Sequence, residues 1–338
     1  MVIVYMAANT NLHKAKEAKN DEFYTQLTDV SKELMHYKQH FKGKTVLCNC
    51  DDPTWSAFWK YFHLNFSVLG LKKLISTHYD KTEPTYKMEY TGGNDNDIEV
   101  GVKTPLEGNG DFRNKECLDL LEECDIVVTN PMFSLFREYV ATLIEHNKKF
   151  IVWGNNNAIT YKEFFPLLKE DKVWLGYTAN KTLVFRIPDS YAKWDEKETQ
   201  KMNDGNHYAK VPAISVFTNL DIEKRHEKLI LWKHYTLEEY PRYDNFDAVE
   251  VSKVADIPVD YDGVMGVPIT FLDKYNPDQF EIVGMAHGDA GVALGLKPYP
   301  RELKKLNKGM RDGDLYYMKN GIPVLPYRRI LICKKAGA

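Results

Sequence analysis

Residues 125–140 read DIVVTNPMFSLFREYV, and this stretch decides the fold. It begins with a short apolar run at residues 126–128, which is typical of a buried parallel strand. The tetrad Asn130, Pro131, Met132 and Phe133 follows the run closely. Open α/β sheets bind ligands beyond the carboxyl ends of their strands. The stretch therefore predicts a functional site at the tip of a central strand.

The residue types of the tetrad suit chemistry on an amino group. The Asn130 side-chain oxygen and the Pro131 carbonyl can each accept one hydrogen of an exocyclic amino group, which directs its lone pair toward an electrophilic methyl group. Proline fixes φ, so the carbonyl is presented from a stiff turn. Phe133 offers a flat face for a base rotated out of a duplex. The alternative is an ordinary Asn-Pro turn with Phe133 in the core.

Strand and helix patterns alternate on both sides of this stretch. A helix is expected at residues 135–145, and a tight turn at 179–181 predicts that strands 172–178 and 182–187 form an antiparallel hairpin at the sheet edge. The other expected strands are residues 44–50, 71–77, 149–153 and 211–218. The pattern predicts an α/β fold with a Rossmann-like mixed sheet and an antiparallel edge hairpin.

The first strand leads into Asp51, Asp52 and Pro53 without a glycine. Glycine is the usual device for a close approach to a pyrophosphate, so its absence disfavours a dinucleotide. Acidic side chains suit a cationic sulfonium and an ammonium group instead. The alternative is that Asp52 and Pro53 only cap the following helix.

From about Asp221 the alternation of strands and helices breaks down, and tyrosine and proline become frequent. We therefore expect two domains, 1–222 and 223–338, the second a smaller and irregular α+β region. Within it, residues 297–311 (KPYPRELKKLNKGMR) gather basic side chains that can neutralise phosphates. The alternative is a solvated basic helix or loop. The basic residues are Lys297, Arg301, Lys304, Lys305, Lys308 and Arg311.

Composition limits the class of protein. The 338 residues carry a net charge of −3, so any nucleic-acid contact must come from local patches rather than from a basic surface throughout. No apolar run approaches the length of a membrane span, and we expect a cytoplasmic protein. The five cysteines lack the paired spacings of a zinc site, so we expect reduced thiols and no metal.

These motifs resemble a known family. The tetrad is similar to the NPPF signature of amino-group methyltransferases, and residues 125–140 as a whole resemble the EcoRI-type adenine-specific DNA methyltransferases. The likeness continues, in the family's order, through DEFYTQ, VLCNCDDP, NGDFR, ITYKE, WLG, TNLD and YDGVMGVPITFL. One departure is Met132, which stands where the family has a second proline. It restores a backbone N–H and removes a steric restraint on Pro131, so activity could be weakened.

The resemblance implies S-adenosylmethionine as cofactor and adenine in duplex DNA as substrate, with base flipping. Asn130, Pro131 and Phe133 would be catalytic. The chain would act as a monomer, and any partner restriction endonuclease would act separately. Asp111 would bond the cofactor's adenine amino group with Phe112 nearby; an Asx turn is the alternative there. The remaining implied cofactor contacts, beside Asn130, are Tyr24, Thr25, Cys50, Asp51, Asp52, Pro53, Thr77 and His78.

Two alternatives to this function stay open. An enzyme with the same tetrad could modify an amino group in RNA or in a protein glutamine side chain. A DNA-binding homologue could instead retain the fold and have lost catalysis, which Met132 would explain.

Overall fold

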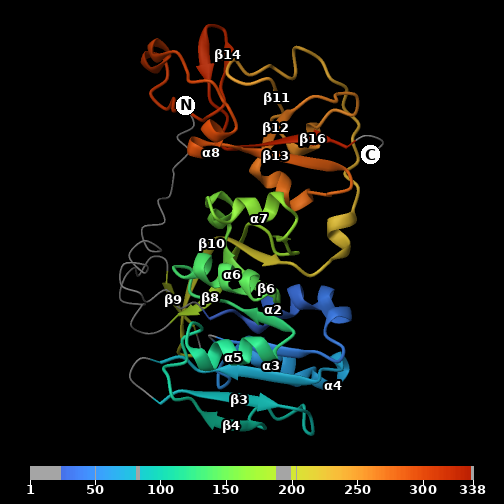
Figure 1. Cartoon of the computed structure of the whole chain (residues 1–338), viewed down its shortest axis with the longest axis vertical. Helices are drawn as coiled ribbons and strands as arrows, with labels where there is room; N and C mark the ends of the chain where they lie inside the picture. Colours follow the sequence, from blue (N-terminus) through green and yellow to red (C-terminus); the bar gives the residue numbers. More distant parts are fainter. Residues whose placement is uncertain (1–23, 50, 81–83, 188–198, 203, 336–338) are drawn as a thin grey trace. The chain divides into compact units, whose positions relative to one another are not determined.

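The computed structural model describes residues 24–49, 51–80, 84–187, 199–202 and 204–335. The chain divides into two compact units (Figure 1). The first lies within Met1–Ala158 and Leu175–Leu220, and the second within Ile159–Trp174 and Asp221–Ala338. Within the described ranges, no helix has the length and apolar character needed to cross a membrane.

Parallel strands form the centre of the large sheet in the first unit. They lie in the order β2-β1-β5-β6, and the residues of β1 and β5 are all buried. Burial on both faces explains why these strands are apolar throughout rather than alternating. The strands are β1 (Thr45–Cys48), β2 (Lys73–Thr77), β5 (Ile126–Thr129) and β6 (Lys149–Asn155).

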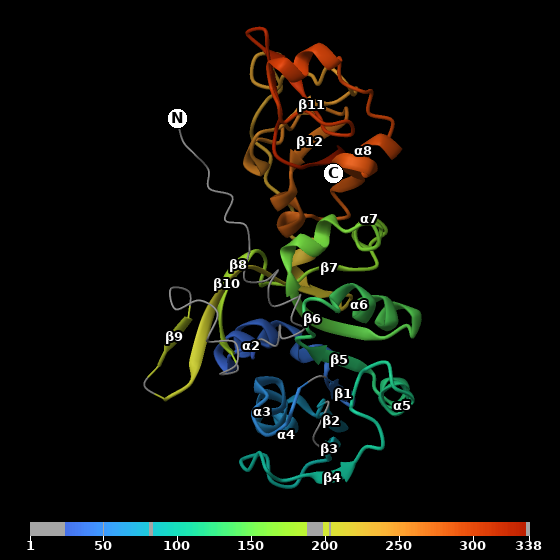
Figure 2. The ribbon, with the colours of Figure 1, turned by 90° about the vertical axis from the view of Figure 1, so that its left-hand side faces the viewer.

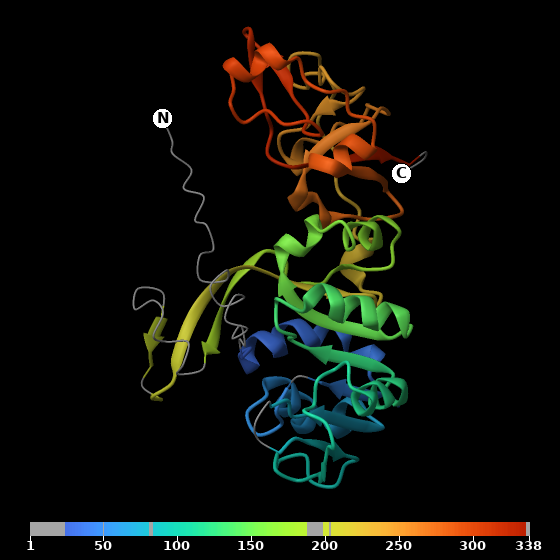
Figure 3. The ribbon, with the colours of Figure 1, turned by 60° about the vertical axis from the view of Figure 1, so that its left-hand side comes forward.

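Antiparallel strands extend this sheet at both edges, which confirms the predicted mixed sheet. On one side β3 (Tyr86–Tyr90) pairs with β2, and β4 (Val102–Pro105) pairs with β3. On the other side β10 (His207–Thr218) runs antiparallel to β6. A bulge between Val211 and Ile214, where Ala213 has a φ of 59°, divides β10 into two halves. Figures 2 and 3 show its first half leaving the body of the sheet.

The antiparallel edge is built differently from the hairpin that the sequence predicts. β7 (Trp174–Leu175) and β8 (Lys181–Ile187) do not pair with each other, and each pairs with β10 instead. The short β9 (Thr199–Lys201) also pairs with β10. The residues around Asn180, whose φ is 50°, let the chain continue along the bulged partner rather than fold back on itself.

Helices lie on both sides of the parallel strands (Figure 2). The α3 helix contributes Phe58, Trp59 and Phe62, which are almost completely buried. The α6 helix lies within the range 135–145 that the sequence predicts, and its buried residues are Phe136, Tyr139, Val140 and Leu143. The segments are α2 (Leu27–Leu34), η1 (Met35–His40), α3 (Ala57–Leu64), α4 (Phe66–Leu69), α5 (Lys115–Glu123), α6 (Phe136–Glu145) and η2 (Asn156–Thr160), where η marks a 3₁₀ helix.

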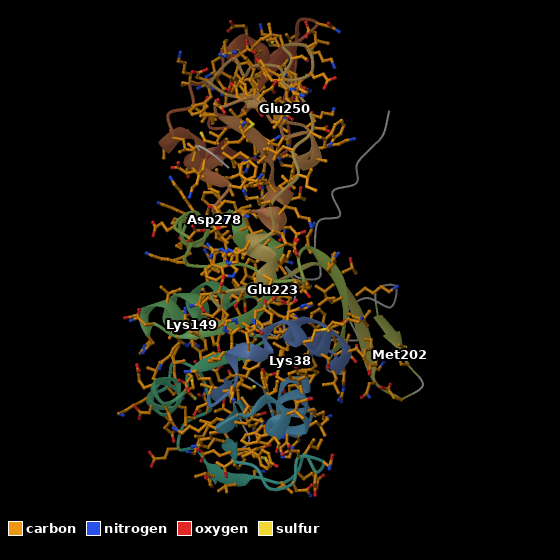
Figure 4. All side chains as sticks on the ribbon, turned by 90° about the vertical axis from the view of Figure 1, so that its right-hand side faces the viewer. Lys38, Lys149, Met202, Glu223, Glu250 and Asp278 are labelled. Atoms are coloured by element: carbon orange, nitrogen blue, oxygen red, sulfur yellow. The ribbon has the colours of Figure 1, made fainter. Side chains whose placement is uncertain are left out.

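The second unit is built on a sheet in the order β11-β12-β16-β13. Its helices are short. A buried ion pair joins Arg329 to Glu250 at 2.5 Å, and Glu250 is labelled in Figure 4. The strands are β11 (Val249–Glu250), β12 (Met265–Pro268), β13 (Phe280–Ala286), β16 (Arg329–Lys334) and the hairpin β14 (Tyr317–Lys319) with β15 (Ile322–Val324). The helical segments are α7 (Phe165–Lys169), η3 (Glu223–His226), η4 (Val254–Asp256), η5 (Ile269–Lys274), α8 (Gly288–Ala293) and η6 (Arg301–Lys305).

The α7 segment comes from the middle of the chain but belongs to the second unit. Arg225 holds it there, because its guanidinium pairs with Asp171 at 2.7 Å and lies 3.9 Å from the ring centroid of Trp174. The assignment of a methyltransferase domain to 1–222 and a recognition region to 223–338 stays a prediction.

Candidate active site

The parallel strands bring several predicted residues to one edge of the sheet. Asp51 and Asp52 follow β1, His78 follows β2, and Asn130 follows β5. A hydrogen bond links the ends of β1 and β2 directly, because the Ser76 hydroxyl of β2 lies within hydrogen-bond distance of the carbonyl oxygens of both Cys48 and Asp51. Cys50, which the sequence also assigned to this edge, lies outside the described residues.

The tetrad forms the turn that joins β5 to α6. Pro131 is buried, and the Asn130 side-chain oxygen is shielded from solvent. The carbonyl of Met132 accepts a hydrogen bond from the Leu135 amide at 2.9 Å, which leads the chain into the helix. Phe133 is half-buried, with its ring edge-on to Phe185 of β8 at a centroid distance of 6.4 Å. The turn therefore holds together an acceptor, a fixed proline and a partly accessible aromatic ring.

Asp51 is the buried acid of this edge. Its carboxyl group accepts hydrogen bonds from the hydroxyls of Ser56 at 3.2 Å and Thr129 at 2.5 Å. The backbone N–H of Asn130 also bonds this group. Burial raises the pKa of Asp51 to about 7, although these hydrogen bonds act in the opposite direction. The side chain thus links the loop after β1 to the tetrad.

Asp52 has different surroundings. It accepts hydrogen bonds from the backbone N–H and hydroxyl of Thr54, at 2.8 and 2.7 Å, and from the Tyr86 hydroxyl at 2.9 Å. The His78 Nε2 lies 3.6 Å from its other oxygen. Ser56 caps α3, so the alternative that Asp52 and Pro53 serve only as a helix cap is wrong.

Several buried polar side-chain atoms have no hydrogen-bond partner in the part of the chain that the structure describes. Among them are Thr77 Oγ1 and His78 Nδ1, at the end of β2, and Thr25 Oγ1. A buried polar atom without a partner costs about 1–3 kcal/mol, so a polar ligand that supplies partners would be favoured here. Tyr24, the neighbour of Thr25 in the chain, packs on Trp55, with ring centroids 4.0 Å apart. These hydroxyl and imidazole atoms can donate or accept hydrogen bonds, so they fit a ligand with hydroxyl, amine and carboxylate groups.

The loop with Asp111 lies against the end of β2. Gly110 has a φ of 73°, and a Cβ there would come within 2.2 Å of the His78 carbonyl oxygen, so only glycine permits this approach. Arg113 donates two hydrogen bonds to the Asp111 carboxylate, at 2.8 and 2.6 Å, and thereby lowers its pKa. The buried Phe112 ring packs on Tyr139 of α6 at a centroid distance of 5.0 Å.

The sequence of nearly the whole chain matches one family model, described as adenine-specific methyltransferase EcoRI, over residues 11–335. The chain belongs to this family. The resemblance that the motifs predicted is thereby confirmed.

Three relatives place the chain within the EcoRI-type family. The type II methyltransferase M.EcoRI of Escherichia coli is 44% identical over 97% of this chain and 98% of its own length. The type II methyltransferase M.MpnI of Mycoplasma pneumoniae is 42% identical over 80% of this chain and 84% of its own. A third, M.MgeORF184P of Mycoplasma genitalium, is 40% identical over 88% of this chain and 93% of its own. No solved structure gives a significant match.

The EcoRI-type site also contains residues that the sequence analysis missed. The Thr129 hydroxyl lies 2.5 Å from the carbonyl oxygen of Asn49 as well as from Asp51. The Tyr139 hydroxyl donates to the Asn49 side-chain oxygen. A threonine next to the tetrad and a polar Asn49 at the end of an apolar strand were the available signals, but neither identifies a partner some 80 positions away in the sequence.

The predicted DNA-binding residues lie on an exposed segment of the second unit. Lys297, Lys304, Lys305, Lys308 and Arg311 are all exposed there. Arg301 is exposed too, but its guanidinium pairs with Asp312 at 2.7 Å and lies 4.5 Å from the Tyr299 ring centroid. The charge of Arg301 is therefore partly neutralised. Among the residues described, no cluster of three or more metal-ligating side chains occurs.

Proposed function

We propose that this chain transfers a methyl group from S-adenosylmethionine to the exocyclic amino group of adenine in a specific duplex DNA sequence. One observation carries the proposal: the Asn130 turn and a set of buried polar atoms without described partners share one sheet edge, in a chain of the EcoRI-type family. The base would rotate out of the helix to reach this edge.

The cofactor would be held around the loops after β1 and β2. S-adenosylmethionine, when bound, supplies an electrophilic methyl carbon on a positively charged sulfur. Tyr24 and Thr25 would contact its amino acid part, while Asp52 would balance its positive charge. Thr77 and His78 offer their buried polar atoms to the ribose. Asp111 keeps acceptor capacity for an amino group, because each carboxylate oxygen can accept more than one hydrogen.

The protein's part in the transfer is to orient the amino group. Asn130 Oδ1 and the Pro131 carbonyl accept its two hydrogens, and Phe133 stacks on the extruded base. In this reaction the amino nitrogen would bond to the methyl carbon as the carbon–sulfur bond breaks, and the extra proton on nitrogen would leave to solvent. Alignment of the two reacting atoms supplies much of the rate, so no strong general base is needed.

Duplex DNA would be gripped through phosphates by the exposed residues Lys297, Lys304, Lys305, Lys308 and Arg311, with a smaller share from Arg301. We expect the chain to act as a monomer, and a cognate restriction endonuclease, where one exists, to act as a separate protein.

Methyl transfer from labelled cofactor to DNA, RNA and protein tests the proposal directly. We expect label in duplex DNA, and mapping of methylated bases in DNA from cells that express the chain should place it on adenine within one sequence. Label found only in RNA, or only in a protein glutamine side chain, would overturn the proposal. It would show that the enzyme modifies an amino group in that substrate instead.

Met132 is the reason for the alternative function, in which the chain binds DNA but does not methylate it. The turn is already held by bonds from Thr129 and Asn130 to Asp51, so the missing proline should matter little. We expect wild type and Met132→Pro to methylate DNA at rates within about 5-fold of each other. An inert wild type that gains activity through Met132→Pro would establish this alternative instead.

A further inference from the structure

Asp51 sits where three segments of the first unit meet. Ser56 bonds its carboxyl group from the start of α3, at 3.2 Å, and Thr129 bonds it from the end of β5, at 2.5 Å. The same Ser56 oxygen accepts from the amides of Phe58 and Trp59, each at 3.2 Å, as the cap of α3. The carboxyl group thus ties a helix start to the strand that delivers Asn130.

The bonds around Thr129 require a particular distribution of protons. Its hydroxyl lies 2.5 Å from the Asn49 carbonyl oxygen and 2.5 Å from Asp51 Oδ2, but it has only one hydrogen to give. If Thr129 donates to Asn49, the contact with Asp51 needs the proton of the carboxyl group itself. Burial favours that neutral form, since it raises the pKa of Asp51 to about 7.

We propose that Asp51 and Thr129 form a positioning pair that sets the place of Asn130 relative to the cofactor loop. The pair touches neither the reacting nitrogen nor the methyl carbon. It acts through the backbone, because the amide of Asn130 bonds the carboxyl group and Thr129 is the preceding residue. This role rests on the proposed function.

The contacts argue that the Asp51 side chain serves the turn rather than the cofactor. Its two oxygens are in hydrogen-bond contact with Ser56, Thr129 and the backbone of Asn130, and the residue is only 6% exposed. Asp52, the next residue, is more exposed and faces His78 and Tyr86. The two adjacent acids therefore have different roles in our proposal. Asp51 contacts the turn that holds the tetrad, and Asp52 is available to the ligand.

Thr129→Val tests the pair because valine keeps the shape and removes the hydroxyl. We expect the single-turnover methylation rate at saturating cofactor and DNA to fall about 100-fold, since small misplacements of reacting groups have effects of this size. Affinity for S-adenosylmethionine and for DNA should stay within about 3-fold. Thr129→Ser, which keeps the hydroxyl, should recover most of the rate.

Thr218→Val is the matched control. Thr218 is also fully buried, and its hydroxyl donates to the Phe150 carbonyl at 2.7 Å, away from the tetrad. Thr218→Val should lose about as much thermal stability as Thr129→Val, but it should keep the wild-type methylation rate. A rate loss shared equally by the two valine variants would mean that the effect is one of general stability, and the positioning role would be overturned.

Asp51→Ala gives a second route should Thr129→Val fail to fold. It should lower the single-turnover rate by a similar factor, and the double variant with Thr129→Val should be no slower than the slower single variant, because both break one link. Wild-type rates in Thr129→Val or Asp51→Ala, or a loss of cofactor affinity alone, would overturn the pair. A wild type that methylates no adenine in DNA would overturn the proposed function instead.

Discussion

Asn130 carries the most demanding role at the scale of single residues. Its side-chain oxygen is shielded from solvent at the tip of β5, where it would accept a hydrogen from the target amino group. We expect Asn130→Ala to reduce methyl transfer by about 10³-fold, at the upper end of what one lost transition-state hydrogen bond removes. Single-turnover rates measure the loss.

Cofactor affinity provides the control for this variant. Since Asn130 acts on the target base in our proposal, Asn130→Ala should bind S-adenosylmethionine within about 3-fold of wild type by calorimetry. Full turnover in the variant would contradict the role assigned to the side chain.

Asp51 predicts a pH dependence of stability. Its pKa is 3.8 when unperturbed and about 7 when buried in the folded chain, so the folded state binds the proton more tightly. The stabilisation is complete below about pH 4 and is lost as the pH rises through 7. Asp51→Asn stays neutral, so wild type should lose roughly 2–3 kcal/mol relative to the variant between pH 5 and 8.

Urea unfolding of wild type and Asp51→Asn at several pH values measures this change. Comparing the two chains at each pH removes the contribution of other titrating groups that the variant leaves in place. A difference in stability that stays constant from pH 5 to 8 would show that Asp51 titrates at its ordinary pKa.

At the scale of elements, the loop of Gly110 provides a test of the cofactor site. A methyl group there would overlap the His78 carbonyl and push the loop with Asp111 away from β2. We expect Gly110→Ala to weaken S-adenosylmethionine binding about 10-fold, through strained backbone and displaced contacts. Equilibrium binding of the cofactor is the measurement.

Gly43→Ala is the control for backbone strain. Gly43 has the same φ of 73° as Gly110, but a Cβ there meets nothing within 4 Å. Both variants place an alanine in a left-handed backbone conformation, which is strained. Only Gly110→Ala also brings a methyl group into the His78 carbonyl. If the two variants bind the cofactor with equal affinity, the loop of Gly110 does not contribute to the cofactor site.

Local patterns predicted the strands and helices better than their pairing. Ile126–Thr129 and Thr45–Cys48 were recognisable because a continuous apolar run needs burial on both faces. The sequence around Asn180 predicts a hairpin turn, because turns of different geometry share the same residue types. Only the bulge at Ala213 in the partner strand, which sequence patterns did not reveal, lets β7 and β8 follow β10 in succession.

The sequence predicts the part of the candidate site whose residues are adjacent in the chain. Asn130, Pro131 and Phe133 form one motif, and the structure keeps them in one turn. Thr129 and Asp51 could not be paired in advance, since their contact depends on the register of two parallel strands. That register is set by packing across the whole sheet rather than by either residue.

At the scale of the whole molecule, our proposal assigns DNA binding to a local basic patch, because the net charge is −3. We expect the triple variant K304A/K305A/K308A to weaken DNA binding and to reduce the slope of log affinity against log salt by up to about 3, roughly 0.9 for each lost phosphate contact. Cofactor binding should be unchanged. Titrations at several salt concentrations measure the slope.

The matched control removes three exposed lysines of the first unit, in K38A/K42A/K72A. It changes the net charge by the same amount (Lys38 is labelled in Figure 4). If both triple variants reduce the slope equally, the chain senses DNA through total charge and residues 297–311 have no special part.

The excursion of Ile159–Trp174 into the second unit has a consequence for modular exchange. The chain passes between the units three times, after Ala158, Trp174 and Leu220. A chimaera that takes only Asp221–Ala338 from a relative would therefore place the relative's residues against α7, including whichever residue replaces Arg225 opposite Asp171. If the second unit sets the target sequence, as we predict, target preference should be transferred only when Ile159–Trp174 and Asp221–Ala338 are exchanged together.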